Sequence, residues 1–321
     1  MIVRILLIYL LLIGLCTPSV ISQVRPRSFT NEVSFALDND VFLFIDRYYS
    51  AGHHVTYRTK IKKQSALNRV FNTDRPGDNL ILSFNLGNEI YTSRTIRFAN
   101  PANMDRPYAG LYYSGFSVNR LKGDSFIGVI EGKVGLVGEQ TGIGNLQAWW
   151  HERTGFREPR GWRYQIADEV IANLNVQLLK SIPLGHQIEM VSNSAIHAGT
   201  GVNKLSQGIT VRFLNFRPLT QSVYSNASLG YAGDPDAMEL FLFAGGGIDY
   251  VVSNVFLEGS LFERNPSPFT VEATPWVVRS RFGLMYARRY NSFSVTVNSL
   301  TKETLKGLSH SYVRLAISRL L

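Results

Sequence analysis

The sequence predicts an all-β fold, specifically a twelve-stranded antiparallel transmembrane β-barrel with a short helix in an extracellular loop. Three observations predict it. Apolar and polar residues alternate with a period of two, many of the alternating segments have ten or more residues, and arginines and lysines occur within them. A tilted strand of roughly nine to eleven residues crosses a bilayer, and a wet lumen accepts charged side chains. Because lipid cannot satisfy bare backbone groups, such strands must close into a barrel.

The first element is an export signal. A start that contains Arg4 is followed by an apolar stretch over residues 5–16 and by small and polar residues up to Gln23. This order is typical of a secretory signal peptide over residues 1–23, which leaves residues 24–321 as the barrel domain. A lipoprotein signal at Cys16 is the alternative, although Leu15 occupies a position that favours a small residue. Cys16 is the one cysteine of the chain, so disulfides do not hold the exported domain together.

Composition narrows the class further. Beyond Gln23 there is no apolar run of eighteen residues, which excludes a helical membrane protein. The formal net charge is +9. For an exported protein, an anionic lipid headgroup is a better candidate partner for this charge than nucleic acid. A role of the charge in solubility alone explains it equally well. We expect outer-membrane lipids as surroundings, no nucleic-acid partner and a monomer.

The strands follow from the alternation. Val33, Phe35 and Leu37 form the apolar face of the first strand, and the pattern recurs to the end of the chain. We predict strands near residues 29–38, 51–63, 79–90, 108–121, 125–138, 168–180, 186–199, 206–215, 239–258, 276–288, 291–302 and 309–320. The ninth segment is alternatively a hairpin broken near Ser253 and Asn254, but bacterial single-chain barrels have even strand numbers. Aromatic residues near strand ends suit interfacial girdles: Tyr91, Tyr108, Tyr112, Tyr113, Trp162 and Trp276.

The connections differ according to whether they follow an odd-numbered or an even-numbered strand. Those after even strands include short turns at residues 122–123, 182–185 and 290, with long exceptions at 64–78 and 216–238. Connections after odd strands are distinctive: "DNDVFLFIDRYYSAG", "YTSRTIRFANPANMDRPYAG" and "GEQTGIGNLQAWWHERTGFREPRGW". All three emerge on one side, which we expect to be the cell exterior.

The third of these connections contains the predicted helix. Asn145 can cap a helix that runs to about Arg153, and Gln147 and His151 lie four residues apart on one face. A lone histidine on a loop helix is usually a surface or packing residue. Its neighbours on the same rim favour a functional role.

Those neighbours are acidic and hydroxyl residues. Asp38, Asn39 and Asp40 end the first strand, and Ser50 opens the second. Such hard oxygen ligands suit calcium, and a cation beside a neutral histidine is a plausible hydrolytic pair. A simple turn explains "DND" as well. His53 and His54 compete for the role of base, but they fit the alternation as wall residues.

Four ordered motifs, "NDVF…DRYYSAG", "DRPYAG", "GEQ…LQAWWH" and "GWRYQ…DE", resemble those of the outer-membrane lipid A 3′-O-deacylases. The resemblance spans nearly all of the chain beyond the signal. It implies a twelve-stranded barrel that acts as a carboxylic ester hydrolase. Its outward-facing site would remove the 3′-linked acyloxyacyl chain of lipid A, the lipid anchor of lipopolysaccharide, in a calcium-dependent reaction.

The resemblance also implies site residues. The family's Asn-Asp pair falls on Asn39 and Asp40, its strand-two hydroxyl on Ser50, and its helix residues on Gln147 and His151. In the implied roles His151 activates water, Asp40 holds calcium, and Ser50 shapes the metal or water site.

The sequence departs from the family pattern at several positions. The second acidic calcium ligand falls on Arg157, and a shift of one residue would place Glu158 there. A family lysine in the connection after the third strand lacks a clean match, and Arg94 or Arg97 is the candidate replacement. The chain ends in Leu-Leu instead of the aromatic residue usual in such barrels. An outer-membrane phospholipase with a serine nucleophile is the enzymatic alternative. The other alternative is a catalytically altered barrel that serves as a channel or lipid-binding scaffold.

Basic and aromatic residues of the rim are candidates for substrate binding. Two alternatives explain the arginines of the rim: they form charge-assisted hydrogen bonds to lipid A phosphates, or they simply face water. These arginines are Arg94, Arg97, Arg106, Arg153, Arg157 and Arg160. Trp149 and Trp150 would lie against acyl chains or the barrel lip. We therefore predict that the helix forms one wall of a groove beside the barrel, with His151 directed into it.

Overall fold

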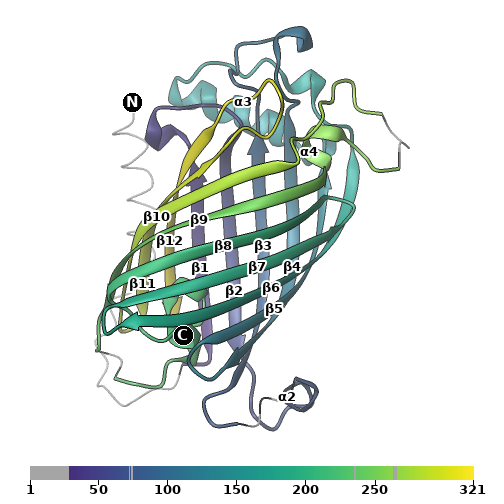
Figure 1. Cartoon of the computed structure of the whole chain (residues 1–321). Helices are drawn as coiled ribbons and strands as arrows, with labels where there is room; N and C mark the ends of the chain where they lie inside the picture. Colours follow the sequence, from purple (N-terminus) through teal and green to yellow (C-terminus); the bar gives the residue numbers. More distant parts are fainter. Residues whose placement is uncertain (1–28, 72, 74, 235, 263–265) are drawn as a thin grey trace.

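A computed structural model describes residues 29–71, 73, 75–234, 236–262 and 266–321, so the predicted signal peptide at 1–23 lies outside the described residues. Twelve strands close into an antiparallel barrel in which β1 pairs with β12 (Figure 1), which confirms the predicted fold. The strands are β1 (Asn31–Asn39), β2 (Tyr49–Lys60), β3 (Asn79–Tyr91), β4 (Ala109–Lys122), β5 (Phe126–Val137), β6 (Glu169–Gly185), β7 (Ile188–Gly199), β8 (Val202–Asn215), β9 (Glu239–Asn254), β10 (Trp276–Arg288), β11 (Asn291–Leu300) and β12 (His310–Leu320).

The helices are short and lie in the connections. They are α2 (Ala66–Val70), α3 (Ile143–Thr154) and α4 (Val255–Glu258), with 3-10 turns η1 (Val41–Leu43), η2 (Pro101–Asn103), η3 (Glu139–Thr141), η4 (Trp162–Tyr164), η5 (Leu219–Gln221), η6 (Val223–Ser225) and η7 (Ser228–Gly230). Within the described ranges, no helix has the length and hydropathy needed to cross a bilayer.

Three predicted boundaries differ from the observed ones by four or more residues. The ninth strand ends at Asn254, whose side chain accepts a hydrogen bond from the Phe256 N–H and so begins α4. The turn predicted at 182–185 belongs to β6, because its apolar residues continue to alternate outward, and the turn lies at residues 186 and 187. β8 begins at Val202 instead of 206, which shortens its preceding connection.

The two faces of the barrel differ in chemistry. Large apolar side chains such as Phe84, Phe116 and Phe282 are exposed on the outside. Inside, charges are paired, as in Arg58 with Glu32 at 2.8 Å. An apolar exterior around a polar lumen is the pattern of a membrane-spanning barrel.

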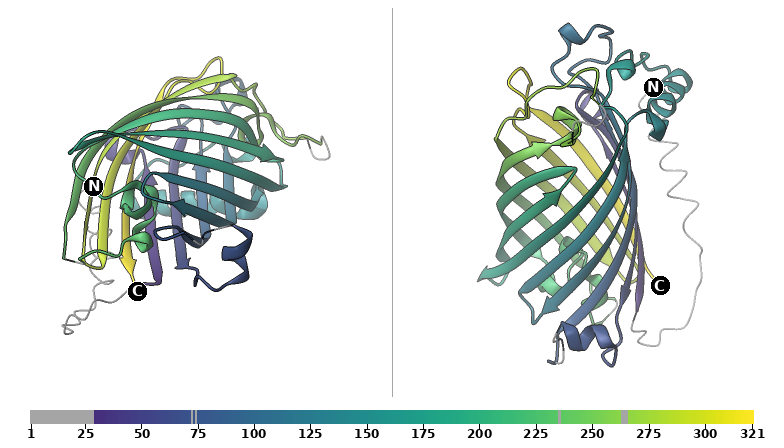
Figure 2. Two further views of the ribbon diagram at one scale, coloured as in Figure 1. Left: turned by 60° about the horizontal axis from the view of Figure 1, so that its bottom comes forward. Right: turned by 90° about the vertical axis from the view of Figure 1, so that its right-hand side faces the viewer.

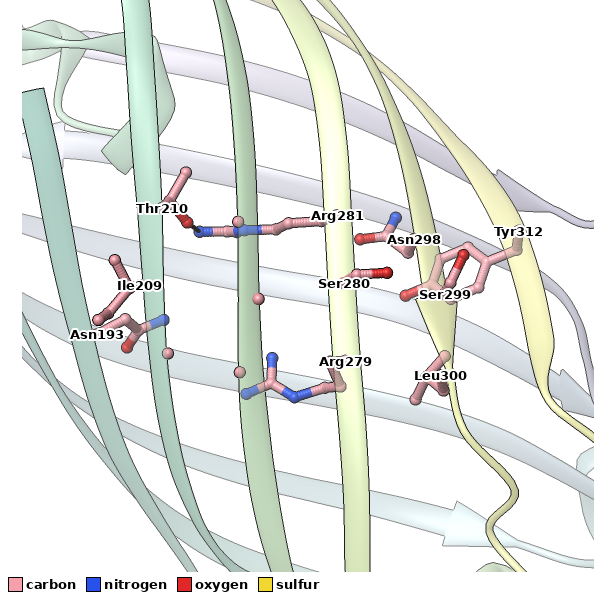
Figure 3. A pocket seen from close by; sticks show the side chains of 14 residues that line it. Asn193, Ile209, Thr210, Arg279, Ser280, Arg281, Asn298, Ser299, Leu300 and Tyr312 are labelled. Carbon is pink, nitrogen blue, oxygen red and sulfur yellow. Dashed lines mark hydrogen bonds between the residues drawn. The ribbon is translucent and has the colours of Figure 1, made fainter. Parts of the chain in front are cut away.

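The connection at 216–238 enters one mouth of the lumen (Figure 2). Its residues Leu219, Ala227 and Leu229 are buried in one cluster with Ile81 and Leu121 of the wall. Further along the lumen, Arg279 and Arg281 extend from β10 across the wall formed by β9 (Figure 3). Arg281 donates a hydrogen bond to Thr210 Oγ1 at 2.9 Å and another to the Tyr224 hydroxyl, which joins the connection to the wall.

We call the opposite mouth, which carries the connections 40–48, 92–108, 138–168, 255–275 and 301–309, the loop end (Figure 1). These connections bind one another: the Tyr48 hydroxyl donates to Asp105 Oδ2 at 2.5 Å, and Thr304 Oγ1 donates to the Asp105 carbonyl at 3.0 Å. Residues far apart in the sequence therefore meet at the loop end. This agrees with the prediction that the connections after odd-numbered strands emerge on one side of the barrel.

Candidate active site

Helix α3 begins three residues earlier than predicted, because Gly142 and not Asn145 precedes its first turn. Gly142 precedes the helix with φ of 65°, a left-handed conformation that glycine adopts at little cost, and no side chain caps the helix. Asn145 instead lies exposed in the first turn.

The helix packs against the outside of the barrel wall. Ile143 is buried in a cluster with Ala51 of β2 and Ile90 of β3. Gly110 permits this approach, because a Cβ built there would lie 2.7 Å from the Cβ of Ile143. In the right-hand view of Figure 2 the teal helix α3 stands to the side of the barrel mouth. The predicted groove beside the barrel is therefore present.

The groove has a volume of about 360 Å³ and combines polar and apolar walls. Its polar lining contains the five predicted catalytic residues and one further acid: Asn39, Asp40, Asp46, Ser50, Gln147 and His151. Its apolar lining includes Leu146, Trp150 and Phe156. Three separate segments of the sequence thus converge on one site.

His151 is held in one orientation and one tautomer. It is 7% exposed, and its Nδ1 lies 2.6 Å from the carbonyl oxygen of Arg157. A carbonyl can only accept, so Nδ1 carries the proton and Nε2 of the neutral ring keeps its lone pair. Gly155, with φ of 74°, ends the helix and turns the chain so that Arg157 returns to the ring.

Ser50 reaches the groove through a β-bulge. The pairing of β2 with β3 shifts between Tyr49 and Ala51, so Ser50 is the additional residue. The Tyr49 hydroxyl points into the lumen toward Asp38 at 2.7 Å, whereas Ser50 and Ala51 both line the groove. Bulges commonly redirect side chains beside functional sites.

The first acid of the "DND" stretch does not belong to the groove. Asp38 points into the lumen, where Arg314 donates to both of its carboxylate oxygens at 2.6 Å. His54 also lies on the lumen side, 3.1 Å from Asp38. The alternation of side chains along β1, and along β2 beyond its bulge, therefore separates these residues from Asn39 and His53, which line the groove.

Two carboxylates line the groove, the buried Asp40 and the partly buried Asp46. Asp40 is 1% exposed and its Oδ2 accepts the Arg47 N–H at 2.8 Å, while Asp46 Oδ1 accepts the Ser50 hydroxyl at 3.3 Å. Burial raises the pKa of both carboxyls, and the charge of Asp46 raises the pKa of Asp40 further. A positive charge on His151, when the ring is protonated, lowers the pKa of Asp46. Neither forms an ion pair with a Lys or Arg in the part of the chain that is described.

This donor set fits a hard cation. The described residues contain no ready cluster of three His, Cys, Asp or Glu side chains, so an ion would depend on the two carboxylates together with hydroxyl, backbone and water oxygens. Calcium accepts such mixed oxygen ligands. The charge of Asp46 raises the pKa of Asp40, and a divalent ion beside the two carboxylates would offset this repulsion.

Glu158 does not line the groove. Its side chain is 75% exposed and lies 3.9 Å from Arg160. The acid that does accompany Asp40 is Asp46, which sequence reasoning missed. It stands inside the motif "DRYYSAG", four residues before Ser50, and that spacing from a groove hydroxyl was the available signal.

Gln147 and Asn39 are fixed by hydrogen bonds. Gln147 Oε1 accepts the Trp162 indole N–H at 2.9 Å, so the side chain can offer the groove its two amide N–H donors. Asn39 Oδ1 accepts the Val41 N–H at 2.8 Å. Both amides are thus oriented before any ligand binds.

The predicted substrate-binding residues divide into two groups. Trp150 lines the groove, whereas Trp149 is 50% exposed on the helix surface. Arg94 and Arg97 are exposed in the connection at 92–108 but do not line the groove. Arg106, one of the rim arginines expected to face lipid A phosphates or water, is instead buried and paired with Glu303 at 2.9 Å.

Together the fold and the groove define a transmembrane β-barrel with a histidine and carboxylate site on its outer wall. The family model "Outer membrane protein LpxR" matches residues 6–319. The chain therefore belongs to the LpxR family of outer-membrane proteins, which confirms the family that the motifs resemble.

A solved structure agrees with this fold. LpxR from Salmonella typhimurium is 18% identical with a TM-score of 0.71, covering 90% of this chain and 100% of that one. Weaker similarity extends to the β domain of the Bordetella autotransporter BrkA (6% identity, 91% and 100% coverage, TM-score 0.44). The translocator domain of the autotransporter NalP from Neisseria meningitidis is comparable (9%, 91% and 88%, 0.42). No curated protein sequence matches the chain.

Proposed function

We propose that this protein is a lipid A 3′-O-deacylase that hydrolyses the ester of the 3′-linked acyloxyacyl chain at the cell surface, with calcium as cofactor. The observation that carries the proposal is the oriented imidazole of His151, which shares a groove with Asp40 and Asp46 on the outer wall of the barrel. A site on that wall can be reached by a lipid without passage through the lumen.

The base is His151. Because Nδ1–H donates to the Arg157 carbonyl, Nε2 is free to accept a proton from water as the oxygen attacks the ester carbonyl. The same proton can then pass to the sugar oxygen as the ester bond breaks, which returns the imidazole to its neutral form.

Asp40 and Asp46 would hold calcium, with Ser50 beside them. The ion, when bound, supplies positive charge near the ester oxygen on which negative charge develops. Gln147 adds to this stabilisation, because its amide N–H groups are available to an oxyanion in the groove.

The rest of the groove suits a lipid. Leu146, Trp150 and Phe156 give it an apolar side, and exposed Trp149 extends that side along α3. Arg94 and Arg97 are exposed at the same end of the barrel, where charge-assisted hydrogen bonds to lipid A phosphates are expected.

A serine nucleophile, as in the phospholipase alternative, is less well supported. The Ser50 hydroxyl donates its hydrogen to Asp46 Oδ1 at 3.3 Å, and no hydrogen bond joins it to His151 in the described part of the chain. Activation of a serine by histidine requires that hydrogen bond.

The test is mass spectrometry of lipid A from cells that express the full chain, His151→Ala or the neighbouring control Glu152→Ala, each with calcium or with a chelator. Glu152 is exposed on the same helix turn, so its loss should not matter. Loss of the 3′ chain with wild type and Glu152→Ala in calcium, and in no other sample, is the expected result. Release of lysophospholipid would favour a phospholipase, and unchanged lipids would favour a scaffold or channel.

A further inference from the structure

A polar pair lies on the outer wall directly below the groove. His53 of β2 and Asn88 of β3 oppose each other in the sheet, with His53 Nδ1 2.9 Å from Asn88 Oδ1. The next outward residues along the two strands, Val55 and Leu86, are each 46% exposed. The pair therefore belongs to the face of the barrel that meets lipid.

The register of the sheet shows that apolar residues share this level of the wall. Asn88 pairs with Tyr112, Tyr112 with Leu136, and Leu136 with Val170. Val170 is 71% exposed. Polar groups within such a surface raise the free energy of the protein in lipid unless a partner satisfies them, so they are candidates for ligand contacts.

His53 joins two hollows of the surface. It lines the groove that contains His151, and it also lines a shallow depression on the outer wall bounded by Val55, Leu86 and Val134. An acyl chain that leaves the groove along the wall into this depression must pass His53.

The hydrogen bond within the pair fixes what it offers to a ligand. Asn88 Oδ1 can only accept, so His53 Nδ1 donates and Nε2 is an acceptor. The Asn88 amide nitrogen supplies donors. Neither His53 Nε2 nor that nitrogen has a partner among the residues described. One acceptor and one donor side by side match a hydroxyl group, which donates and accepts at once, whereas an ester carbonyl would use the amide alone.

We propose that His53 and Asn88 bind a hydroxyl group on an acyl chain of the lipid in the groove, and thereby select hydroxylated acyl chains over unsubstituted ones. This inference rests on the proposed function, because it takes the groove to be the lipid site. It assigns to the pair a role in specificity and not in the chemical step.

The probe is a matched pair of synthetic glucosamine-disaccharide lipids whose acyl chains have equal lengths and either carry or lack free hydroxyl groups. Binding of an equimolar mixture to the full-length His151→Ala barrel is measured by native mass spectrometry, and kcat/KM for each lipid is measured with intact His151. The variants are His53→Phe and Asn88→Leu. His186→Phe, the same change at an exposed turn residue, is the control.

Two lost hydrogen bonds correspond to a preference of roughly tenfold for the hydroxylated lipid, in binding and in kcat/KM. This ratio should fall to near one in His53→Phe and Asn88→Leu and persist in His186→Phe. Three outcomes would each overturn the proposal. The ratio could be near one in the protein that keeps His53 and Asn88, it could stay unchanged in both variants, or both variants could bind the two lipids equally less tightly.

The two readouts separate this inference from the proposed function. A binding preference that depends on His53, without turnover of either lipid by the intact protein, would support the hydroxyl site and count against the deacylase. Turnover of the lipids without any binding preference would support the deacylase and count against the hydroxyl site.

Discussion

The imidazole of His151 donates its Nδ1–H to the main-chain carbonyl of Arg157, 2.6 Å away. Arg157 is the position at which the sequence lacks the acidic residue expected from the family resemblance. Its contact with His151 uses the main chain, so it does not depend on which side chain stands there. The contribution of Arg157 to the groove is a backbone oxygen, which any residue supplies.

Arg157→Ala should therefore retain activity within about threefold, because the carbonyl remains and surface substitutions cost little. Gly155→Val should lower kcat roughly tenfold or more, because a branched side chain in the left-handed conformation shifts the turn that carries this carbonyl. Rates of lipid A deacylation by the two purified variants test the contrast. Equal losses in both would contradict the orienting role.

Removal of either groove carboxylate should lower the affinity of the groove for calcium. We expect Asp40→Asn and Asp46→Asn each to raise the calcium concentration for half-maximal activity about tenfold or more, since ligand charge tunes calcium affinity. Glu158→Gln serves as the matched control, because its side chain is exposed outside the groove. If Glu158→Gln shifted the calcium curve and Asp46→Asn did not, our assignment of the second acid would be wrong.

Calcium dependence should also vary with pH. Burial raises the pKa of the Asp40 and Asp46 carboxyls, so in the absence of the ion they take up protons at a higher pH than exposed aspartates. Protonated carboxyls do not bind calcium, and the concentration required should rise as pH falls. Calcium titrations at several pH values measure this slope, which should be shallower in Asp46→Asn.

The loop end should depend on Tyr48. Its hydroxyl donates to Asp105 and accepts the Leu308 N–H at 2.8 Å, so it joins three connections. Loss of a hydrogen bond to a buried carboxylate costs about 1 to 3 kcal/mol. Tyr48→Phe should therefore make the connection at 92–108 more susceptible to limited proteolysis, with Tyr57→Phe on the outer wall as control.

Alkaline pH should produce the same loosening in the wild type. Burial and the Asp105 carboxylate raise the pKa of Tyr48 to about 12. A raised pKa means that this stabilisation is complete below the ordinary tyrosine pKa of about 10 and is lost as the pH rises toward 12. Proteolysis at stepped alkaline pH follows the change, and a wild type as resistant as at neutral pH would count against it.

The lumen should conduct poorly while the connection at 216–238 occupies its mouth. Arg212 donates to Glu189 at 2.7 Å and to Ser222 at 2.8 Å, and thus ties the connection to β7 and β8. Replacement of residues 219–230 by a short glycine and serine linker should raise single-channel conductance in planar bilayers. High conductance in the intact protein would favour the channel alternative.

The sequence predicted the barrel because period-two alternation is set by the pleat of a strand and is visible without any tertiary information. Strand ends were less predictable. Ile182 and Leu184 continue β6 beyond the expected turn, and the glycine that begins α3 is a weaker signal than Asn145, a residue of good capping propensity.

The site was predictable to the extent that its residues lie in motifs. Asn39, Asp40, Ser50, Gln147 and His151 all line the groove. Asp46 was missed because its approach to Ser50 depends on the bulge at Tyr49, which is a property of pairing with β3 and not of the strand itself. The burial of Arg106 was also missed, because its ion pair with Glu303 joins residues that are distant in the sequence.

Helix α3 stands outside the wall and encloses its groove there, with Ile143 seated over Gly110. A substrate that is itself part of the leaflet then arrives by sideways diffusion in two dimensions. The quantity that governs encounter is the surface density and mobility of neighbouring lipids, not a concentration in water. Stiffening the leaflet should slow such a protein even when every residue of its site is intact.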